Sequence, residues 1–228
     1  MQKFGKSQPV KRFEDQRFLT GHGHYVDDIA PAGALHGYVL RSSVAHGRIT
    51  ALDPSEARTA PGVHLVLTLA DLEAEGVKVG LDADPIKTID GGTGTAPERP
   101  VLARDKVRFV GEPVAFVVAD SLALAKDAAE LIEFEVDDLP AHVALAVGGA
   151  GLHDEAPDNK AFEYGKGDRA ATEAAIAAAT HVVTLRVEDN RVMASSMEPR
   201  GCYAEIEGNR LHFCYGGQGV WGTKKRLA

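Results

Sequence analysis

The sequence predicts an α+β protein in which two regions follow one another along the chain. Between Arg17 and Val136, short apolar runs typical of strands alternate with single helical segments, which indicates a mixed module with one sheet. After a Gly- and Pro-containing stretch come an alanine-rich helical segment and a hairpin pattern. Apolar residues at 44% and charged residues at 25% of 228 residues suit a chain with its own hydrophobic core.

Strands are expected in the first region wherever apolar and β-branched residues run together between turn signals. The run 113–119 is the most apolar and is expected at the centre of the sheet. The expected strands are 35–41, 63–68, 107–110, 113–119 and 133–136. The Gly-rich stretch 80–100 is expected to be a long loop. It does not fit a dinucleotide-binding fingerprint, because no strand directly precedes it and no helix follows.

Helices are expected where a capping residue stands before a helical run. Pro54 suits the first position of a short helix that Asp53 caps and that ends near residue 60. Thr68 can cap a second helix over 69–75.

A longer helix is expected over 122–131, capped by Asp120 or Ser121. Its helical spacing places one set of residues on the inward face: Leu124, Ala128 and Leu131.

The second region carries a helix, a strand and a hairpin in that order. We expect the helix at 169–180, a half-buried strand at 181–188, and the hairpin strands at 202–206 and 210–215. A Gly-rich loop and the opening turns of a helix follow from residue 216. Because this β structure would expose its inner face, we expect another polypeptide segment to cover it.

The charge balance argues against nucleic acid as a partner. The chain has 25 basic and 33 acidic side chains, a net charge of −8, and its one dense basic run is 224–226. No apolar run reaches the roughly 18 residues that a membrane-spanning helix requires, so no membrane span is expected. The N-terminal residues show no hydrophobic signal-like stretch, and we expect a cytoplasmic protein.

The cysteines Cys202 and Cys214 exclude an iron–sulfur cluster built by this chain alone, because such clusters use about four thiolates. They also exclude a disulfide-stapled secreted scaffold. Two interpretations remain open: both are buried small apolar residues, or they face each other across the hairpin.

The histidines give only weak indications of chemistry. His22 and His24 with the carboxylates at 27–28 could approach a metal, but alternate residues of an extended segment point to opposite faces. His46 is expected to be a packed or loop histidine rather than a general base. No G-x-S-x-G nucleophile pattern is present, so a hydrolase is not indicated.

The stretch 217–224 resembles a phosphate-binding loop only in its glycine spacing. Its order is Gly-Thr-Lys where that motif needs Gly-Lys-Ser/Thr, so the lysine is misplaced for phosphates. The stretch still offers backbone amides at a helix N-terminus, which suit an anionic cofactor, and one neutral side chain, Gln218, that can donate or accept. Nearby, Glu198 and Arg200 flank a proline, and we expect a structural ion pair in preference to a catalytic role.

Nine segments, in order along essentially the whole chain, carry a further signal: 17–28, 41–49, 61–63, 110–115, 139–140, 153–159, 190–191, 197–201 and 218–219. Together they resemble the large subunit of the molybdenum hydroxylases, the family of xanthine dehydrogenase, aldehyde oxidase and aerobic carbon monoxide dehydrogenase.

The resemblance implies an α/β-hammerhead domain over 17–137 and the start of the first molybdopterin-binding domain over 161–228. From their composition, residues 1–16 are expected to form an extended arm and residues 138–160 a linker. In this family a glutamine lies beside molybdenum and hydrogen-bonds an oxo ligand without binding the metal itself; by match it is Gln218. Gly217 and Gly219 would help to hold the cofactor, usually in its cytosine dinucleotide form in bacterial members. The resemblance assigns no direct metal ligand to this chain.

The chain also departs from the family, whose large subunits are roughly three times as long. The general base and the substrate-positioning residues have no counterpart, so the resemblance assigns no catalytic residue here and we expect no turnover by the chain alone. The expected partners are the remaining part of the molybdopterin-binding subunit, an FAD subunit and a [2Fe–2S] subunit. The expected function is the N-terminal part of a molybdenum-dependent oxidoreductase that uses water-derived oxygen; the alternative is a catalytically silent docking module.

Overall fold

The computed structural model describes residues 11–29, 31–81, 84–189, 192, 195–196 and 198–227. Contacts divide the chain into two compact units. The central unit comprises residues 34–184, and the loop unit combines the chain up to residue 33 with the chain from residue 185. Each unit is described by itself.

The main sheet of the central unit has the order β1–β7–β3 and is antiparallel throughout. Its strands are β1 (His36–Arg41), β7 (Pro113–Ala119) and β3 (Val63–Leu67). As the sequence predicts, the apolar β7 lies in the middle. Val114, Ala115, Val117 and Ala119 are fully buried there, because apolar neighbours cover both faces of the strand.

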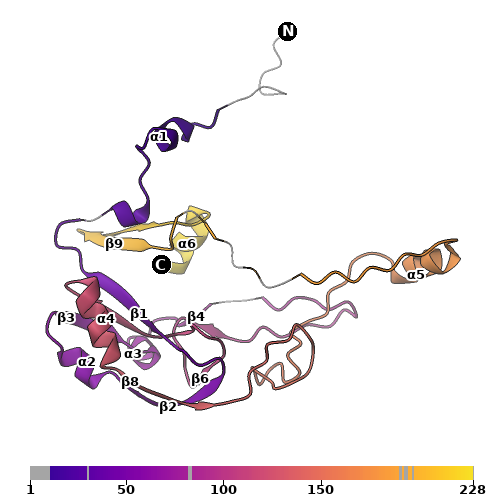
Figure 1. The fold of residues 1–228 in the computed structure, drawn as a ribbon, viewed down its shortest axis with the longest axis horizontal. Helices are drawn as coiled ribbons and strands as arrows, with labels where there is room; N and C mark the ends of the chain where they lie inside the picture. Colours follow the sequence, from indigo (N-terminus) through magenta and orange to yellow (C-terminus); the bar gives the residue numbers. More distant parts are fainter. Residues whose placement is uncertain are drawn as a thin grey trace, which may run out of the picture. The chain divides into compact units, whose positions relative to one another are not determined.

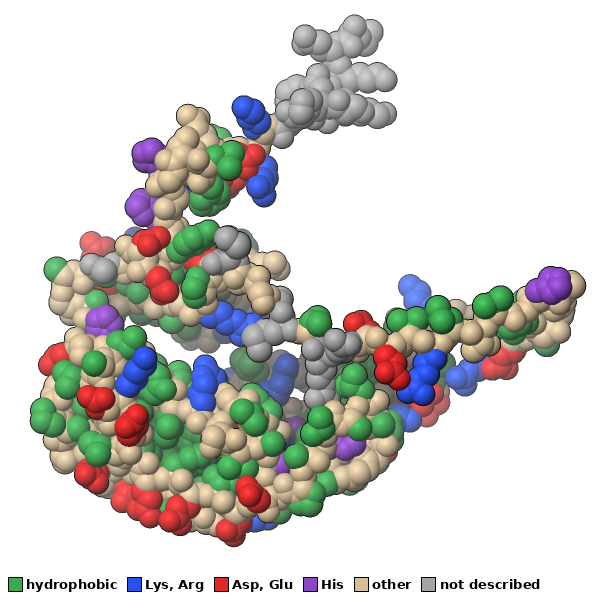
Figure 2. All heavy atoms as spheres, viewed as in Figure 1, with side chains coloured by type: hydrophobic (Ala, Val, Ile, Leu, Met, Phe, Trp, Pro, Cys, Tyr) green, Lys and Arg blue, Asp and Glu red, His purple; other side chains and the backbone are tan. Residues whose placement is uncertain are grey.

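A second sheet packs against the other side of the central unit's core, so the prediction of a single sheet is wrong. Its order is β6–β2–β8, with β6 (Lys106–Val107), β2 (Gly47–Asp53) and β8 (Glu133–Asp138). β8 thus pairs with β2 and not with β7, and β2 was not recognised from the sequence. Leu40 and Leu52 contact both core clusters and so join the two sheets. Figure 2 shows acidic side chains along the surface that β2 and β8 form.

Three short helices of the central unit begin near their predicted positions. α3 (Leu69–Ala74) has Thr68 as its N-cap, and the Asp71 carboxylate accepts hydrogen bonds from both the amide and the hydroxyl of Thr68. α2 (Ser55–Thr59) begins one residue later than predicted, after Pro54, while Asp53 accepts from the Ser55 amide.

The helix α4 (Leu122–Glu130) lies across the β1–β7–β3 sheet (Figure 1). Ser121 caps it by accepting from the Leu124 amide. Ala125, Ala128 and Ala129 form its buried face. The prediction that Leu131 faces inward is wrong: Leu131 is the C-cap and is exposed, and Ile132 is buried in its place because the helix has already ended.

The stretch 80–100 is mostly irregular, as predicted, and is closed by a two-residue ladder between β4 (Gly80–Leu81) and β5 (Arg99–Pro100). The chain that follows β8, residues 139–160, is held to the sheets by side-chain hydrogen bonds. The Nδ1 of the buried His46 ring donates a 2.8 Å hydrogen bond to the Pro140 carbonyl, because a carbonyl oxygen can only accept. Arg108 donates to Leu152 O, and Asn159 donates to two carbonyls of the same connection.

α5 (Arg169–Ala178) follows at the predicted place, and the Asp168 carboxylate caps it by accepting from the Ala171 amide. The predicted strand at 181–188 is wrong for this structure, because these residues pair with no strand among those described. Their apolar side chains are left exposed: Val183 by 93%, Leu185 by 80% and Val187 by 74%. The alternating pattern is real, but a strand needs a partner to satisfy its backbone groups.

The loop unit contains α1 (Asp15–Leu19), the 3₁₀ helix η1 (Val26–Asp28), the hairpin of β9 (Cys202–Glu207) and β10 (Arg210–Tyr215), and α6 (Val220–Leu227). Contacts join η1 to β9. No helix within the described parts of the chain is long and apolar enough to cross a bilayer.

The core of the central unit generates a stability prediction. Val117→Ala removes two methyl-sized groups from a side chain that is 0% exposed, so we expect a loss of about 2 kcal/mol in the free energy of unfolding, measured in urea. Val183→Ala is the matched control, because Val183 is 93% exposed and should change stability by less than about 0.5 kcal/mol. Equal losses in both variants would contradict the burial assigned to β7.

A second prediction concerns pH. Burial, followed by the nearby Arg108 cation, lowers the pKa of His153 below its usual 6.5. The unfolded chain therefore binds more protons, so this contribution to stability is fully present above about pH 6.5 and is lost as the pH falls through the lowered pKa. His153→Gln should flatten the stability profile between about pH 7.5 and 5, measured by urea unfolding at each pH.

The exposed His181→Gln variant controls for the loss of an imidazole. Asp53, Asp71 and Asp90 do not disturb this window, because their pKa values lie below 3.8. An unchanged slope in His153→Gln would show that His153 does not couple folding to protonation.

Candidate functional site

The β9–β10 hairpin separates its side chains into two different faces. The register pairs Cys202 with Tyr215 and Ile206 with Leu211, so one face carries only apolar or aromatic residues. They are Cys202, Ala204, Ile206, Leu211, Phe213 and Tyr215. The other face is polar and contains the ion pair of His212 with Glu207. Ile206 is 78% exposed, so the apolar face is largely uncovered within the described residues.

The hairpin turn was predicted from its sequence, and Gly208 provides the positive φ of 60° that it requires. Both interpretations of the cysteines are wrong. Cys202 is exposed and Cys214 is half-buried. Cys202 lies opposite Tyr215 and Cys214 lies opposite Tyr203, so the two thiols are one position out of register and point to opposite faces.

A glycine loop, residues 216–219, joins β10 to α6, and at three of its positions a side chain would meet close neighbours or an unfavourable backbone conformation. A Cβ on Gly216 would lie 3.0 Å from the Glu198 carboxyl carbon, and one on Gly217 would lie 1.9 Å from Cε2 of Tyr215. Gly219 has a φ of +80°, which L-residues rarely adopt. The glycines are therefore required by close packing at one end of the loop and by backbone conformation at the other.

Tyr215 fastens the glycine loop to α6. Its hydroxyl donates to Gly219 O at 2.7 Å and lies 2.5 Å from the Thr223 hydroxyl. Its ring stacks on Phe213, with centroids 5.4 Å apart, and passes against the backbone of Gly217. Sequence analysis did not identify Tyr215 or Thr223. Their separation of eight residues across a loop and a helical turn gives no local signal.

Gln218 lies in the middle of the glycine loop and is exposed. The structure thus brings Gly217, Gln218 and Gly219 into one turn immediately before the eight-residue helix α6. Backbone amides at a helix N-terminus carry partial positive charge and favour anions. The loop backbone is therefore chemically suited to hold an anionic group. The Gln218 amide can hydrogen-bond that group as a donor or as an acceptor.

Glu198 does not form the expected ion pair with Arg200. Its Oε1 instead accepts a hydrogen bond from the Val26 amide at 3.1 Å, and Arg200 is exposed. Among the ion pairs that the described residues form, none joins these two side chains. The local sequence favoured a pair only two residues apart, whereas the actual partner is 172 residues away along the chain.

The other sequence candidates do not converge on a metal. Within the described residues, no group of three or more His, Cys, Asp or Glu side chains could hold a metal ion, and this includes His22, His24 and the carboxylates after them. His46 is buried in the central unit, 4% exposed, as a packed histidine.

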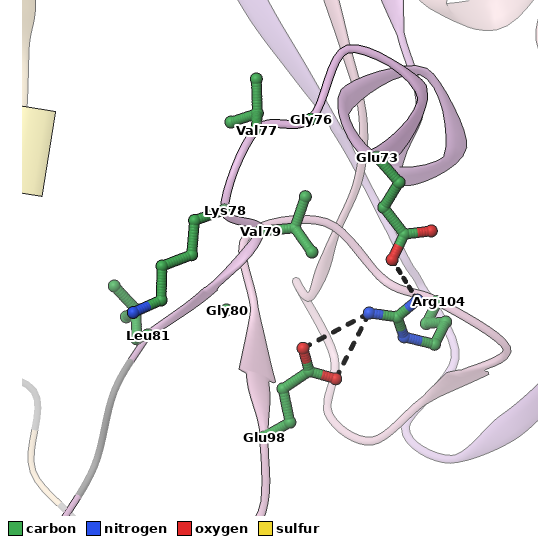
Figure 3. Close-up of a pocket in the computed structure, with 9 residues that line it drawn as sticks. All are labelled: Glu73, Gly76, Val77, Lys78, Val79, Gly80, Leu81, Glu98 and Arg104. Carbon is green, nitrogen blue, oxygen red and sulfur yellow. Dashed lines mark hydrogen bonds and ion pairs between the residues drawn. The ribbon is translucent and has the colours of Figure 1, made fainter. Parts of the chain in front are cut away.

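The central unit has a hollow of about 480 Å³ beside α3, shown in Figure 3. The Arg104 guanidinium pairs there with the Glu73 carboxylate and, at 3.3 Å, with Glu98. The hydrogen bond to Glu73 raises the pKa of Arg104 and keeps it charged. Two carboxylates already neutralise this cation, so Arg104 is not available to hold an anion.

Two known protein families match consecutive parts of the chain. Residues 20–140 match the family model for the aldehyde oxidase and xanthine dehydrogenase a/b hammerhead domain. The chain belongs to this family. Residues 152–228 match the molybdopterin cofactor-binding domain, and the glycine loop lies inside that match. The fold expected from the sequence, a hammerhead domain followed by the start of a molybdopterin-binding domain, is confirmed.

Known relatives support the same assignment over most of the chain. The nicotine 6-hydroxylase large subunit of Paenarthrobacter nicotinovorans is 40% identical over 87% of this chain and 24% of its own length. The carbon monoxide dehydrogenase large chain of Hydrogenophaga pseudoflava is 35% identical over 85% of this chain and 25% of its own length. The crystal structure of quinoline 2-oxidoreductase from Pseudomonas putida 86 is similar with a TM-score of 0.72 and 34% identity, covering 92% of this chain and 26% of that one. This hydroxylase-family chain therefore spans about a quarter of the length of these relatives.

The glycine loop generates a prediction. Gly217→Ala should displace the Tyr215 ring, release its hydrogen bonds to Gly219 and Thr223, and destabilise the loop by about 2 kcal/mol. Trp221, the sole tryptophan, lies in the first turn of α6, so its emission reports the change. Gly222→Ala is the matched control, because its Cβ would meet no atom within 4 Å. It should keep the wild-type emission and gain up to about 1 kcal/mol of helix stability. The same emission shift in both variants would refute the packing assigned to Gly217.

Proposed function

We propose that the chain is the N-terminal part of the large subunit of a molybdenum-dependent oxidoreductase, and that the glycine loop forms one wall of the cofactor site. The observation that carries this proposal is the glycine loop with Gln218 at its centre, inside the match to the molybdopterin cofactor-binding domain. Gly217 and Gly219 would let the backbone approach the cofactor, and Gln218 would hydrogen-bond a ligand of the metal without binding the metal itself. When bound, the cofactor supplies oxidation or hydroxylation of an aldehyde, an N-heterocycle or carbon monoxide with water-derived oxygen.

The loop's own chemistry fits such a group. The glycines leave the loop backbone uncovered by side chains, and Gln218 is exposed beside it. An anionic pterin cofactor finds amide donors there at the N-terminus of α6. We propose the cytosine dinucleotide form, on the basis of the family resemblance. The side chains at this wall are neutral, so they can bind and orient the cofactor but cannot remove a proton from substrate.

The rest of the site would come from a partner polypeptide that corresponds to the remaining part of the molybdopterin-binding subunit. The uncovered apolar face of the hairpin supports this, because a two-stranded hairpin is only marginally stable without a covering layer. The names of relatives mark them as subunits of larger enzymes, and we propose an FAD subunit and a [2Fe–2S] subunit as further partners. We propose the cytoplasm as the compartment, consistent with the free thiols of Cys202 and Cys214.

Within this scheme we assign residues 17–137 to the hammerhead domain, 138–160 to a linker and 161–228 to the start of the cofactor-binding domain, after an arm over 1–16. No residue of the described chain is placed as a general base, so we propose that the chain is inactive alone. The second candidate function, a catalytically silent docking module, is favoured by the well-packed core of the central unit, which requires no cofactor.

The test is molybdenum retention in a complex. The chain is co-expressed with a polypeptide equivalent to the part of its relatives that it does not cover, and metal per complex is measured by elemental analysis. We expect the wild-type complex to retain molybdenum and Gln218→Ala to bind it about tenfold more weakly, since residues beside a metal's ligands often contribute that much.

Gln16→Ala, another exposed glutamine in the loop unit, is the matched control and should retain the wild-type metal content. Equal molybdenum in the Gln218 variant and wild type would refute the role of Gln218. If the chain is metal-free and monodisperse and does not bind the co-expressed polypeptide, the result would favour the docking module.

A further inference from the structure

Glu198 connects two segments that are far apart in the sequence. Its Oε1 accepts from the Val26 amide at 3.1 Å, and this hydrogen bond is partly buried. The same carboxylate lies against Gly216, where an added Cβ would come within 3.0 Å of its carboxyl carbon and of Oε2. One carboxylate thus touches the N-terminal helix η1 and the point where β10 enters the glycine loop.

The η1 segment is itself firmly placed. Val26 is buried, 8% exposed, and the Asp28 carboxylate closes the turn by accepting from the Tyr25 amide at 2.7 Å. Gly201, just before β9, packs on this turn: a Cβ there would lie 3.0 Å from Asp27 Oδ1 and 3.6 Å from a methyl group of Val26. The amide that holds Glu198 therefore belongs to a turn that is packed against the base of the hairpin.

We propose that Glu198 is a positioning residue for the glycine loop. The Val26 amide fixes its carboxylate, and the carboxylate holds the backbone at Gly216, so that Gln218 is presented in one orientation. A hydrogen bond from a backbone amide to a carboxylate is about twice as strong as one between neutral groups. Such a bond is suited to hold the Glu198 side chain in one position. Tyr215 fastens the far end of the loop at Gly219, and Glu198 fastens the near end.

This assignment makes the N-terminal segment part of the cofactor-binding wall, although it lies before the hammerhead strands in the sequence. The significance for binding rests on the proposed function of the glycine loop. The positioning itself does not, because it concerns only hydrogen bonds and packing within this chain.

The test is hydrogen exchange of the amides of residues 216–220 in the full chain, with the amides of β7 as an internal reference. Glu198→Ala should speed exchange in the loop by about tenfold and leave β7 unchanged. Glu198→Gln keeps an oxygen that can accept from the Val26 amide, so it should restore near wild-type protection. Glu205→Ala, an exposed glutamate of β9, is the matched control and should leave the loop unchanged.

A second variant removes the donor and keeps Glu198. Tyr25 has an extended conformation, φ −96° and ψ 170°, which is compatible with a following proline, and the first position of a helix tolerates proline. Val26→Pro therefore removes the amide while the hydrogen bonds of η1 itself, from Asp28 to Tyr25 and from Ile29 to Val26, remain possible. Val26→Ala controls for the lost side chain.

We expect Val26→Pro to speed loop exchange as Glu198→Ala does, beyond any effect of Val26→Ala, and the double variant to add nothing. Unchanged loop exchange in Glu198→Ala would overturn the proposal, as would additive effects of the two variants or no rescue by Gln. Exchange is measured without cofactor, so these outcomes are separate from molybdenum retention. Retention unaffected by Gln218→Ala would remove the proposed function and leave the positioning role standing.

Discussion

The close approach of the Tyr215 ring to the backbone of Gly217 is the constraint on which the glycine loop depends. It puts the tyrosine hydroxyl at Gly219 O and Thr223, which sets where α6 begins relative to β10. Any side chain at position 217 would occupy the space of the ring. The loop is therefore shaped by contacts behind it, and Gln218, which makes none of those contacts, stays exposed and available to a ligand.

The two units hold their structure by different means. The central unit buries β7 on both faces and the alanine face of α4, so its stability comes from apolar burial. In the loop unit, Val26 is the only core residue among those described; the Tyr215 hydroxyl holds the glycine loop by a hydrogen bond to Gly219 O, and Glu198 accepts from the Val26 amide. Such bonds contribute less each than a buried side chain. A binding site on the loop unit therefore requires further stabilisation, which a polypeptide packed on the apolar face of the hairpin would provide.

The sequence predicted those elements correctly whose structure depends on residues close together along the chain. The caps at Thr68 and Ser121, the turn at Gly208 and the central place of β7 all follow from nearby residues. The single sheet was wrong because pairing β8 with β2 is a choice between distant partners. The strand at 181–188 was wrong because an alternating pattern does not supply a partner. The glycine loop was predicted from its Gly-rich run before a helix, but the bond from Val26 to Glu198 spans 172 residues and leaves no trace in sequence spacing.

Under the proposed function, a glutamine at the centre of the loop suits the electrostatics of its surroundings. The amides before α6 already favour negative charge, so a lysine at position 218 would add attraction without selectivity and could only donate. A carboxylate there would repel the same ligand and could only accept when ionised. A neutral amide can donate or accept, so it stays paired when its partner gains or loses a proton. With Glu198 and Tyr215 fixing the backbone on either side, that adaptable group is held on an otherwise rigid turn.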